Sequence, residues 1–189
     1  VYPLALTGVS QLTMKAKADG SKVDKDGNLT TDTKEAVGSA LIGQDFTEDC
    51  YFQGRVSAVN YNTYTEEQKE SGEYAGVASG SYNYANSNPE LKERMEKDLE
   101  QFLKEHPGVK AEDVPAELLT ASGSGLDSHI SPESAEVQIP TVAKNSGLSE
   151  EEVKKIVEEN TEKKTLGVFG EERVNVLGCN LDIAAAMGK

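Results

Sequence analysis

Four side chains with the chemistry of a serine hydrolase lie close together between Ala121 and Leu148: Ser122, Ser124, Asp127 and His129. A nucleophilic serine needs a base within hydrogen-bonding reach and a third group that orients this base. On a strand, the aspartate and the histidine would share a face, because they are two positions apart. The local order, however, is Ser-Gly-Ser-Gly-Leu and not the Gly-x-Ser-x-Gly elbow. We therefore favour a structural network around the turn amides over catalysis.

Two further polar side chains could bind a ligand or a partner. Gln138 follows the same turn, and its amide can bond either a ligand base or a neighbouring loop. Bonding to a loop is the preferred interpretation. Arg55 is a lone cation in the small-residue segment Gly54-Arg55-Val56-Ser57. It predicts an internal salt bridge or a contact with a partner subunit.

Turn and cap signals indicate how these residues are positioned. The small residues from Ala121 to Gly125 allow a tight turn with close backbone approach. Ser131 and Pro132 then predict the start of a helix that runs toward Asn145, with a kink at Pro140.

Other elements are expected on both sides of this region. Asn88 and Pro89 begin a helix with one apolar face, which His106-Pro107-Gly108 ends. A capping box at Ser149 predicts the second arm of a helical hairpin. The remaining segments predict a hairpin turn rather than a calcium loop at 24–28, strands at 36–46 and 173–177, a strand or packed loop at 51–59, a surface loop at 60–88, and short helices at 115–120 and 180–187. The predicted class is α/β (α+β), a small sheet flanked by helices.

Composition limits the function further. The chain has 189 residues and a formal net charge of −14, which argues against binding nucleic acid or an anionic membrane surface. The sequence lacks a GxxxxGK[ST] loop and the Asp-Lys-Thr-Gly motif, so it has no ordinary P-loop and no phosphorylation site of P-type pumps. No CxxC or HExxH motif is present, and no metal site is predicted. Cys50 and Cys179 do not by themselves establish a disulfide.

The stretch 1–14 is apolar but shorter than the ~20 residues that a spanning helix needs. We expect it to be the C-terminal end of a truncated transmembrane helix, followed by one soluble domain at 15–189. Lys15, Lys17 and Lys22 mildly favour a cytoplasmic location for this flank.

Several segments, in the same order along the chain, resemble the KdpC family, the C subunits of the bacterial Kdp potassium-transporting P-type ATPase. They are GSALIGQ at 38–44, YFQGRVSA at 51–58, ASGSYNYANSNP at 78–89, ASGSGLDSHISP at 121–132 and RVNVLGCN at 173–180. The resemblance covers nearly the whole chain. Departures include Val56, Ser128, Thr141 and Gly178-Cys179, and the segment 65–76 looks like an insertion.

The resemblance implies an accessory, non-catalytic subunit of a high-affinity potassium uptake complex. Such a subunit would stabilise the assembly of a pore-like A subunit with an ATP-hydrolysing B subunit, and would cover the external potassium entrance. The domain would be extracytoplasmic, on a single-pass anchor in the inner or cell membrane. The resemblance links Gln138 to a nucleotide, with ATP reached through the complex and no firmly bound cofactor. An external domain would not meet cytoplasmic ATP, so these two implications conflict.

Candidate subunit-contact or structural residues are Tyr51, Phe52, Gly54, Arg55, Ser57, Ser122, Gly125, Asp127 and His129. The alternatives are a free-standing extracytoplasmic ligand-binding module and, as a lesser one, a serine hydrolase.

Overall fold

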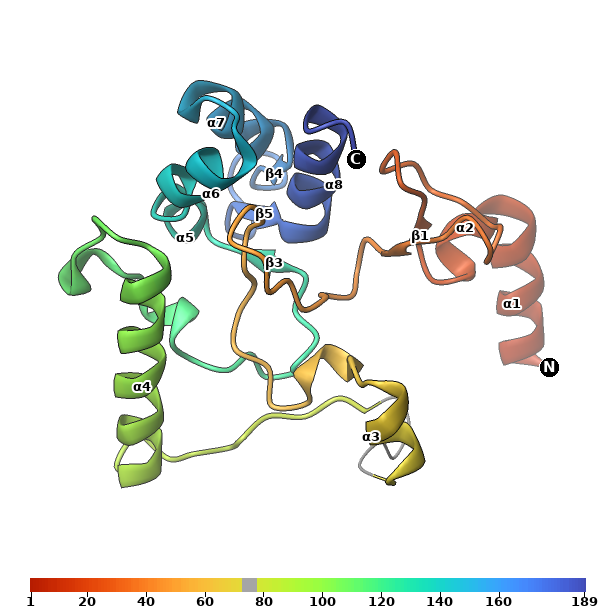
Figure 1. Cartoon of the computed structure of the whole chain (residues 1–189). Helices are drawn as coiled ribbons and strands as arrows, with labels where there is room; N and C mark the ends of the chain where they lie inside the picture. The colour runs from red at the N-terminus through yellow and green to blue at the C-terminus, as the bar shows by residue number, and fades with distance from the viewer. Residues whose placement is uncertain (73–77) are drawn as a thin grey trace.

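The computed structural model describes residues 1–72 and 78–189. Helices dominate the described residues, and the strands are two or three residues long (Figure 1). The helices are α1 (Tyr2–Thr13), α2 (Lys15–Ala18), α3 (Glu66–Glu70), α4 (Pro89–Glu105), α5 (Pro132–Glu136), α6 (Ile139–Ser146), α7 (Glu150–Glu159) and α8 (Val176–Ala186). The strands are β1 (Lys22–Val23), β2 (Gly38–Ser39), β3 (His129–Ile130), β4 (Thr161–Glu162) and β5 (Arg173–Asn175), and single 3₁₀ turns are η1 (Asn60–Asn62), η2 (Ala111–Asp113) and η3 (Ala116–Leu118).

Two small antiparallel sheets are present in the described residues. One pairs β1 with β2, and the other has the order β3-β5-β4. In the second sheet His129 lies opposite Asn175, and Thr161 lies opposite Val174. Helices α5 to α8 surround this sheet, as Figure 1 shows. The predicted α+β class, a small sheet flanked by helices, is therefore confirmed.

The hydrophobic core lies where these helices meet the three-stranded sheet. It includes Ile130, Val142, Val153, Val174 and Ile183, all of which are 0% or 1% exposed. The predicted helical hairpin is present: α6 ends at Gly147 with φ +79°, and the capping box of Ser149 and Glu152 begins α7. Since a left-handed residue closes a helix and a capping box opens one, the turn between the two arms is short.

Helix α4 forms as predicted between the Asn88 cap and His106. Phe102 is its buried residue, and its ring stacks on the His106 ring with the centroids 4.0 Å apart. The buried His106 also donates from Nδ1 to the Phe102 carbonyl oxygen (3.0 Å). Burial lowers the pKa of His106, so the neutral imidazole is favoured in the core.

Several element boundaries differ from the prediction. The helix expected across 132–145 is two helices, because Val137 and Gln138 interrupt it before Pro140, which occupies the first turn of α6. The strand expected at 173–177 ends at Asn175, whose side chain caps α8 by accepting from the Gly178 amide (2.9 Å). The strand expected at 36–46 is reduced to β2 and one isolated bridge. The predicted insertion at 65–76 contains α3, and its end lies outside the described residues.

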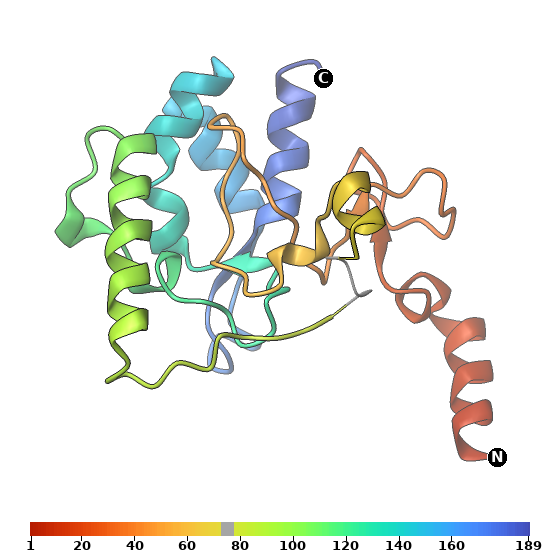
Figure 2. The ribbon, with the colours of Figure 1, turned by 60° about the horizontal axis from the view of Figure 1, so that its bottom comes forward.

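Helix α1 and the β1–β2 sheet lie to one side of this body (Figures 1 and 2). Of residues 2–13, none is buried. Among the described residues, the structure contains no helix with the length and apolar character needed to cross a membrane.

Candidate functional site

The two segments at 51–58 and 121–131 lie against one another. The Ser122 amide donates to the Val56 carbonyl (3.1 Å), and Ser57 Oγ donates to the Gly125 carbonyl (2.6 Å). Val56 and Ala121 also form an isolated parallel bridge. Segments separated by more than sixty residues of chain are thus joined through backbone contacts into one unit.

Gly125 makes this approach possible. Its φ is +67°, and an added Cβ would come within 2.8 Å of the Gly80 carbonyl oxygen and 2.7 Å of Val59 Cγ2. Glycine avoids both the steric cost of this conformation and the collision. The close backbone approach predicted from the small-residue run is confirmed at this position.

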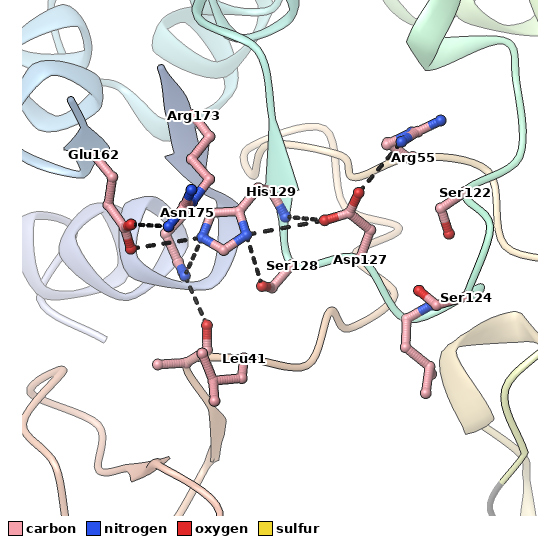
Figure 3. Close-up of polar contacts among 12 residues, drawn as sticks. Leu41, Arg55, Ser122, Ser124, Asp127, Ser128, His129, Glu162, Arg173 and Asn175 are labelled. Carbon is pink, nitrogen blue, oxygen red and sulfur yellow. Dashed lines mark hydrogen bonds and ion pairs between the residues drawn. The ribbon is translucent and has the colours of Figure 1, made fainter. Parts of the chain in front are cut away.

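Arg55 and Asp127 connect the same two segments through their charges. Arg55 Nη1 lies 3.3 Å from Asp127 Oδ2, with the two side chains 24% and 33% exposed (Figure 3). The other Nη of Arg55 donates to the Ala121 carbonyl (3.5 Å). The predicted internal salt bridge of Arg55 is therefore present, at the surface edge of the unit.

Two buried side-chain amides hold the backbone of Phe52 and Gln53. Asn180 accepts from the Phe52 amide (2.8 Å) and donates to the Phe52 carbonyl (2.9 Å). Gln138 accepts from the Gln53 amide (2.8 Å) and donates to the carbonyls of Gln53 (3.2 Å) and Ser134 (3.0 Å). We call this arrangement the amide clamp. The clamp provides hydrogen-bond partners for the backbone N–H and C=O groups of a segment that lies outside both sheets. Buried backbone groups require such partners.

The side chains of Phe52 and its neighbour Tyr51 lie in different surroundings. The Phe52 side chain is 0% exposed and belongs to the core, whereas Tyr51 is partly buried beside Phe46. Gln138 is also 0% exposed. Its amide group therefore makes all of its observed hydrogen bonds inside the domain, at the break between α5 and α6.

The serine hydroxyls shape the turn. Ser122 Oγ accepts from the Gly125 amide (2.8 Å), and Ser124 Oγ accepts from the Leu126 amide (3.1 Å). Asp127 Oδ1 accepts from the His129 amide (3.1 Å). These contacts are those of the structural network that the sequence predicts, because each side chain satisfies a backbone donor of the turn.

His129 joins this turn to the sheet, as Figure 3 shows. Its Nδ1 lies 3.0 Å from Ser128 Oγ and 3.9 Å from Asp127 Oδ1, while Nε2 lies 3.8 Å from Glu162 Oε1 on β4. Burial, followed by the charge of Arg173, lowers the pKa of His129 despite the two carboxylates. The serine next to the imidazole is thus Ser128, a 3% exposed residue, and not one of the two expected from the sequence.

Sequence reasoning missed three residues that hold the unit together: Asn180, Glu117 and Glu162. Glu117 Oε1 accepts from the Ser131 amide (2.6 Å) and so connects η3 to the start of α5. Asn180 lies in the RVNVLGCN segment, where an asparagine within a mainly apolar helix was the available signal. Cys179, its neighbour, is free and 0% exposed, and Cys50 is free and also buried.

Comparison with known proteins now adds the family. A model described as "KdpC: K+-transporting ATPase, c chain" matches residues 1–185. The chain belongs to the KdpC family. It is 55% identical to a potassium-transporting ATPase KdpC subunit of Clostridioides difficile strain 630, over 100% of this chain and 89% of that protein. A KdpC subunit of Clostridium kluyveri is 57% identical over 99% of the chain and 86% of its own length. The KdpC resemblance predicted from the sequence is confirmed, and this chain is thereby an accessory subunit of a potassium uptake complex.

Proposed function

We propose that this KdpC-family chain stabilises the assembly of a pore-like A subunit with an ATP-hydrolysing B subunit. The amide clamp is the observation that carries the proposal. It fixes the backbone at 52–53, while Arg55, a few positions further on, and its ion-pair partner Asp127 from the other segment remain partly exposed at the surface edge. A fixed backbone beside partly exposed charges suits binding to a partner, because little conformational entropy is lost when the partner docks.

In this proposal the residues of the unit have two roles. Phe52, Ser122 and Gly125 hold its shape from inside. Tyr51, Arg55 and Asp127, together with the neighbouring Gly54, Ser57 and His129, would supply polar contacts to the other subunits. Residues 1–14 would be the end of a membrane helix, and residues 15–189 a domain outside the membrane near the potassium entrance.

Nucleotide contact by Gln138 remains a separate hypothesis. In the clamp its Oε1 and Nε2 are hydrogen-bonded to Gln53 and Ser134. A direct contact with ATP would require these bonds to open. The complex would supply ATP through its hydrolysing subunit in any case.

A ligand-binding module is the second candidate, and one cavity favours it. The cavity has a volume of about 710 Å³ and is bordered by His129, Arg173 and Lys164 as well as by several glutamates. Charges of both signs around such a space would form charge-assisted hydrogen bonds with a small ligand that carries both charges. A chain that stays monodisperse and shows no affinity for A or B subunits would support this candidate.

The experiment that tests the assembly proposal is potassium-stimulated ATP hydrolysis by the A and B subunits, with and without the full-length chain. We expect the activity and the co-purification of A with B to depend on the chain. If Arg55 and Asp127 contact the other subunits, reversing both charges together should not restore the binding that either single reversal weakens. Restored binding would show that the pair acts only as an internal bridge. A complex that assembles and hydrolyses ATP equally well without the chain would disprove the proposal.

A further inference from the structure

An exposed apolar turn connects β4 to β5. We define the hairpin tip as Thr165 to Gly170, with the sequence TLGVFG. Leu166 is 86% exposed, Val168 73% and Phe169 65%. No residue of the tip carries a charge, so three large apolar side chains are exposed to solvent without a charged neighbour inside the turn.

The backbone of the tip is ordered by its own hydrogen bonds. The Thr165 amide donates to the Phe169 carbonyl (2.8 Å), and the Phe169 amide donates back to the Thr165 carbonyl (3.0 Å). Leu166 has φ +55°, a left-handed conformation that is unfavourable for a leucine. The apolar side chains therefore project from a defined turn.

The size of the tip favours lipid over protein as its occupant. A specific protein interface buries at least about 1,000 Å² in total, which three side chains cannot supply alone. Insertion into a bilayer interface needs no shape complementarity, since its strength depends on the apolar area that leaves water. Three adjacent apolar side chains at the end of a hairpin match this requirement.

The flanking charges are compatible with a lipid surface. Lys163 and Lys164 precede the tip, and Glu171 and Glu172 follow it, so the local charges balance. Lys164 Nζ lies 3.4 Å from Glu171 Oε2, which pairs charges across the neck of the hairpin. The formal net charge of the whole chain, −14, disfavours anionic lipid. Zwitterionic headgroups therefore fit best.

The position of the tip agrees with this occupant. In Figure 2 the blue loop that joins β4 to β5 points toward the same lower side of the molecule as α1. The segment with the stacked Tyr82 and Tyr84 rings runs along that side as well. Tyrosine is enriched at membrane–water interfaces. We propose that the hairpin tip inserts into the interfacial region of the bilayer, as a second anchor in addition to the N-terminal helix. This inference rests on the proposed membrane role of residues 1–14.

The chain contains no tryptophan, so a single introduced one reports its own site. The test uses full-length Phe169→Trp chain in vesicles of zwitterionic phosphatidylcholine with bromine in the acyl chains. Leu41→Trp is the matched control, because Leu41 is 66% exposed and lies on the β1–β2 side of the molecule. We expect a blue-shifted, bromine-quenched emission at position 169, and an emission at position 41 that only aqueous acrylamide quenches.

In the complete complex, the difference in emission between the Phe169→Trp complex and the parent complex separates lipid from protein, because it removes the signal of tryptophans in the other subunits. Bromine quenching at position 169 that persists in the complex supports the proposal. Emission that neither bromine nor acrylamide quenches would indicate that a protein surface covers the tip. Emission that acrylamide quenches would indicate that the tip is exposed to water. Either result overturns the proposal. Co-purification of the subunits is a separate readout, so loss of quenching with intact assembly refutes the lipid contact alone.

A variant with Leu166→Ser and Phe169→Ser provides a second test. In the chain of residues 1–189, which holds only the end of the proposed membrane helix, we expect it to partition into phosphatidylcholine vesicles at least tenfold more weakly than the Leu41→Ser control. Both variants should retain the far-ultraviolet circular dichroism of the parent chain, because the changed side chains are exposed. Equal partitioning of the two variants would contradict the inference.

Discussion

Replacing Gln138 with alanine removes one half of the amide clamp. The side chain makes three hydrogen bonds, to the amide and carbonyl of Gln53 and to the carbonyl of Ser134. At about 0.5–1.5 kcal/mol each, their loss lowers the free energy of unfolding by about 2–4 kcal/mol. A typical domain is stable by only about 5–15 kcal/mol, so the effect should be large.

Urea-induced unfolding, followed by circular dichroism, measures this difference. The matched control is Gln101→Ala on the exposed face of α4, where the amide bonds the Glu105 carboxylate at the surface. We expect the control to change stability by less than about 0.5 kcal/mol. If the two alanine variants have the same stability, the structural role assigned to Gln138 is wrong.

Gln138→Glu adds a pH test of the same clamp. The carboxylate has the shape of the amide but cannot donate to the two carbonyls, and burial raises its pKa above the ordinary value of about 4.3. A raised pKa means that stability is present at low pH and is lost as the pH rises through the folded-state pKa. We expect this variant to approach wild-type stability below pH 5, whereas the alanine variant should not recover.

The clamp also affects how activity data on Gln138 are interpreted. A fall in potassium-stimulated ATP hydrolysis accompanied by lost stability follows from the clamp alone. The same fall with unchanged stability would instead favour a nucleotide contact, and would refute the reasoning above.

Two further outcomes follow from the site. Gly125→Ala should lower the free energy of unfolding in urea by about 2–4 kcal/mol. A non-glycine residue at positive φ costs about 1–3 kcal/mol, and the added Cβ also collides with the Gly80 carbonyl. Gly147→Ala is the control and should cost less, because the space around Gly147 is open. The folded domain holds the pKa of His129 below the ordinary value of about 6.5. The domain therefore loses stability as the pH falls below the ordinary pKa, because the unfolded chain then binds a proton at His129 more readily than the folded one. His129→Gln should make the free energy of unfolding depend less on pH between pH 7.5 and 5.5. An unchanged slope would show that protonation of His129 does not couple to folding.

Local signals in the sequence predicted the helices well. Asn88 with Pro89, Ser131 with Pro132 and the Ser149 capping box each begin a helix where expected, because a cap is encoded within four residues of chain. The glycine turn at Gly125 was also predictable from its own small residues. These features need no information about distant segments.

The strands were harder to predict, since a strand of two residues has no periodicity to detect. The break between α5 and α6 was missed as well, although Pro140 was expected to disturb the helix. The break lies at Gln138, whose side chain turns to Gln53, 85 positions away. A contact at that separation leaves no local pattern.

The candidate residues were partly predictable. The small-residue segments indicated close packing, and the charges of Arg55 and Asp127 allowed a salt bridge. Which partner each residue has could not be derived, because an asparagine at position 180 offers no sign that it binds Phe52 across 128 positions of chain.

That last separation has a consequence for how the domain is made. The backbone at Phe52 emerges from the ribosome early, but the side chain that holds it arrives with α8, near the end of the sequence. Contacts between such distant residues form late, because closing a long loop must precede them. A nascent or prematurely ended chain would contain the segment 51–58 without one half of its support. If that segment contacts the other subunits, as we propose, chains that end before Asn180 would present it with half of the amide clamp missing and should bind those subunits more weakly.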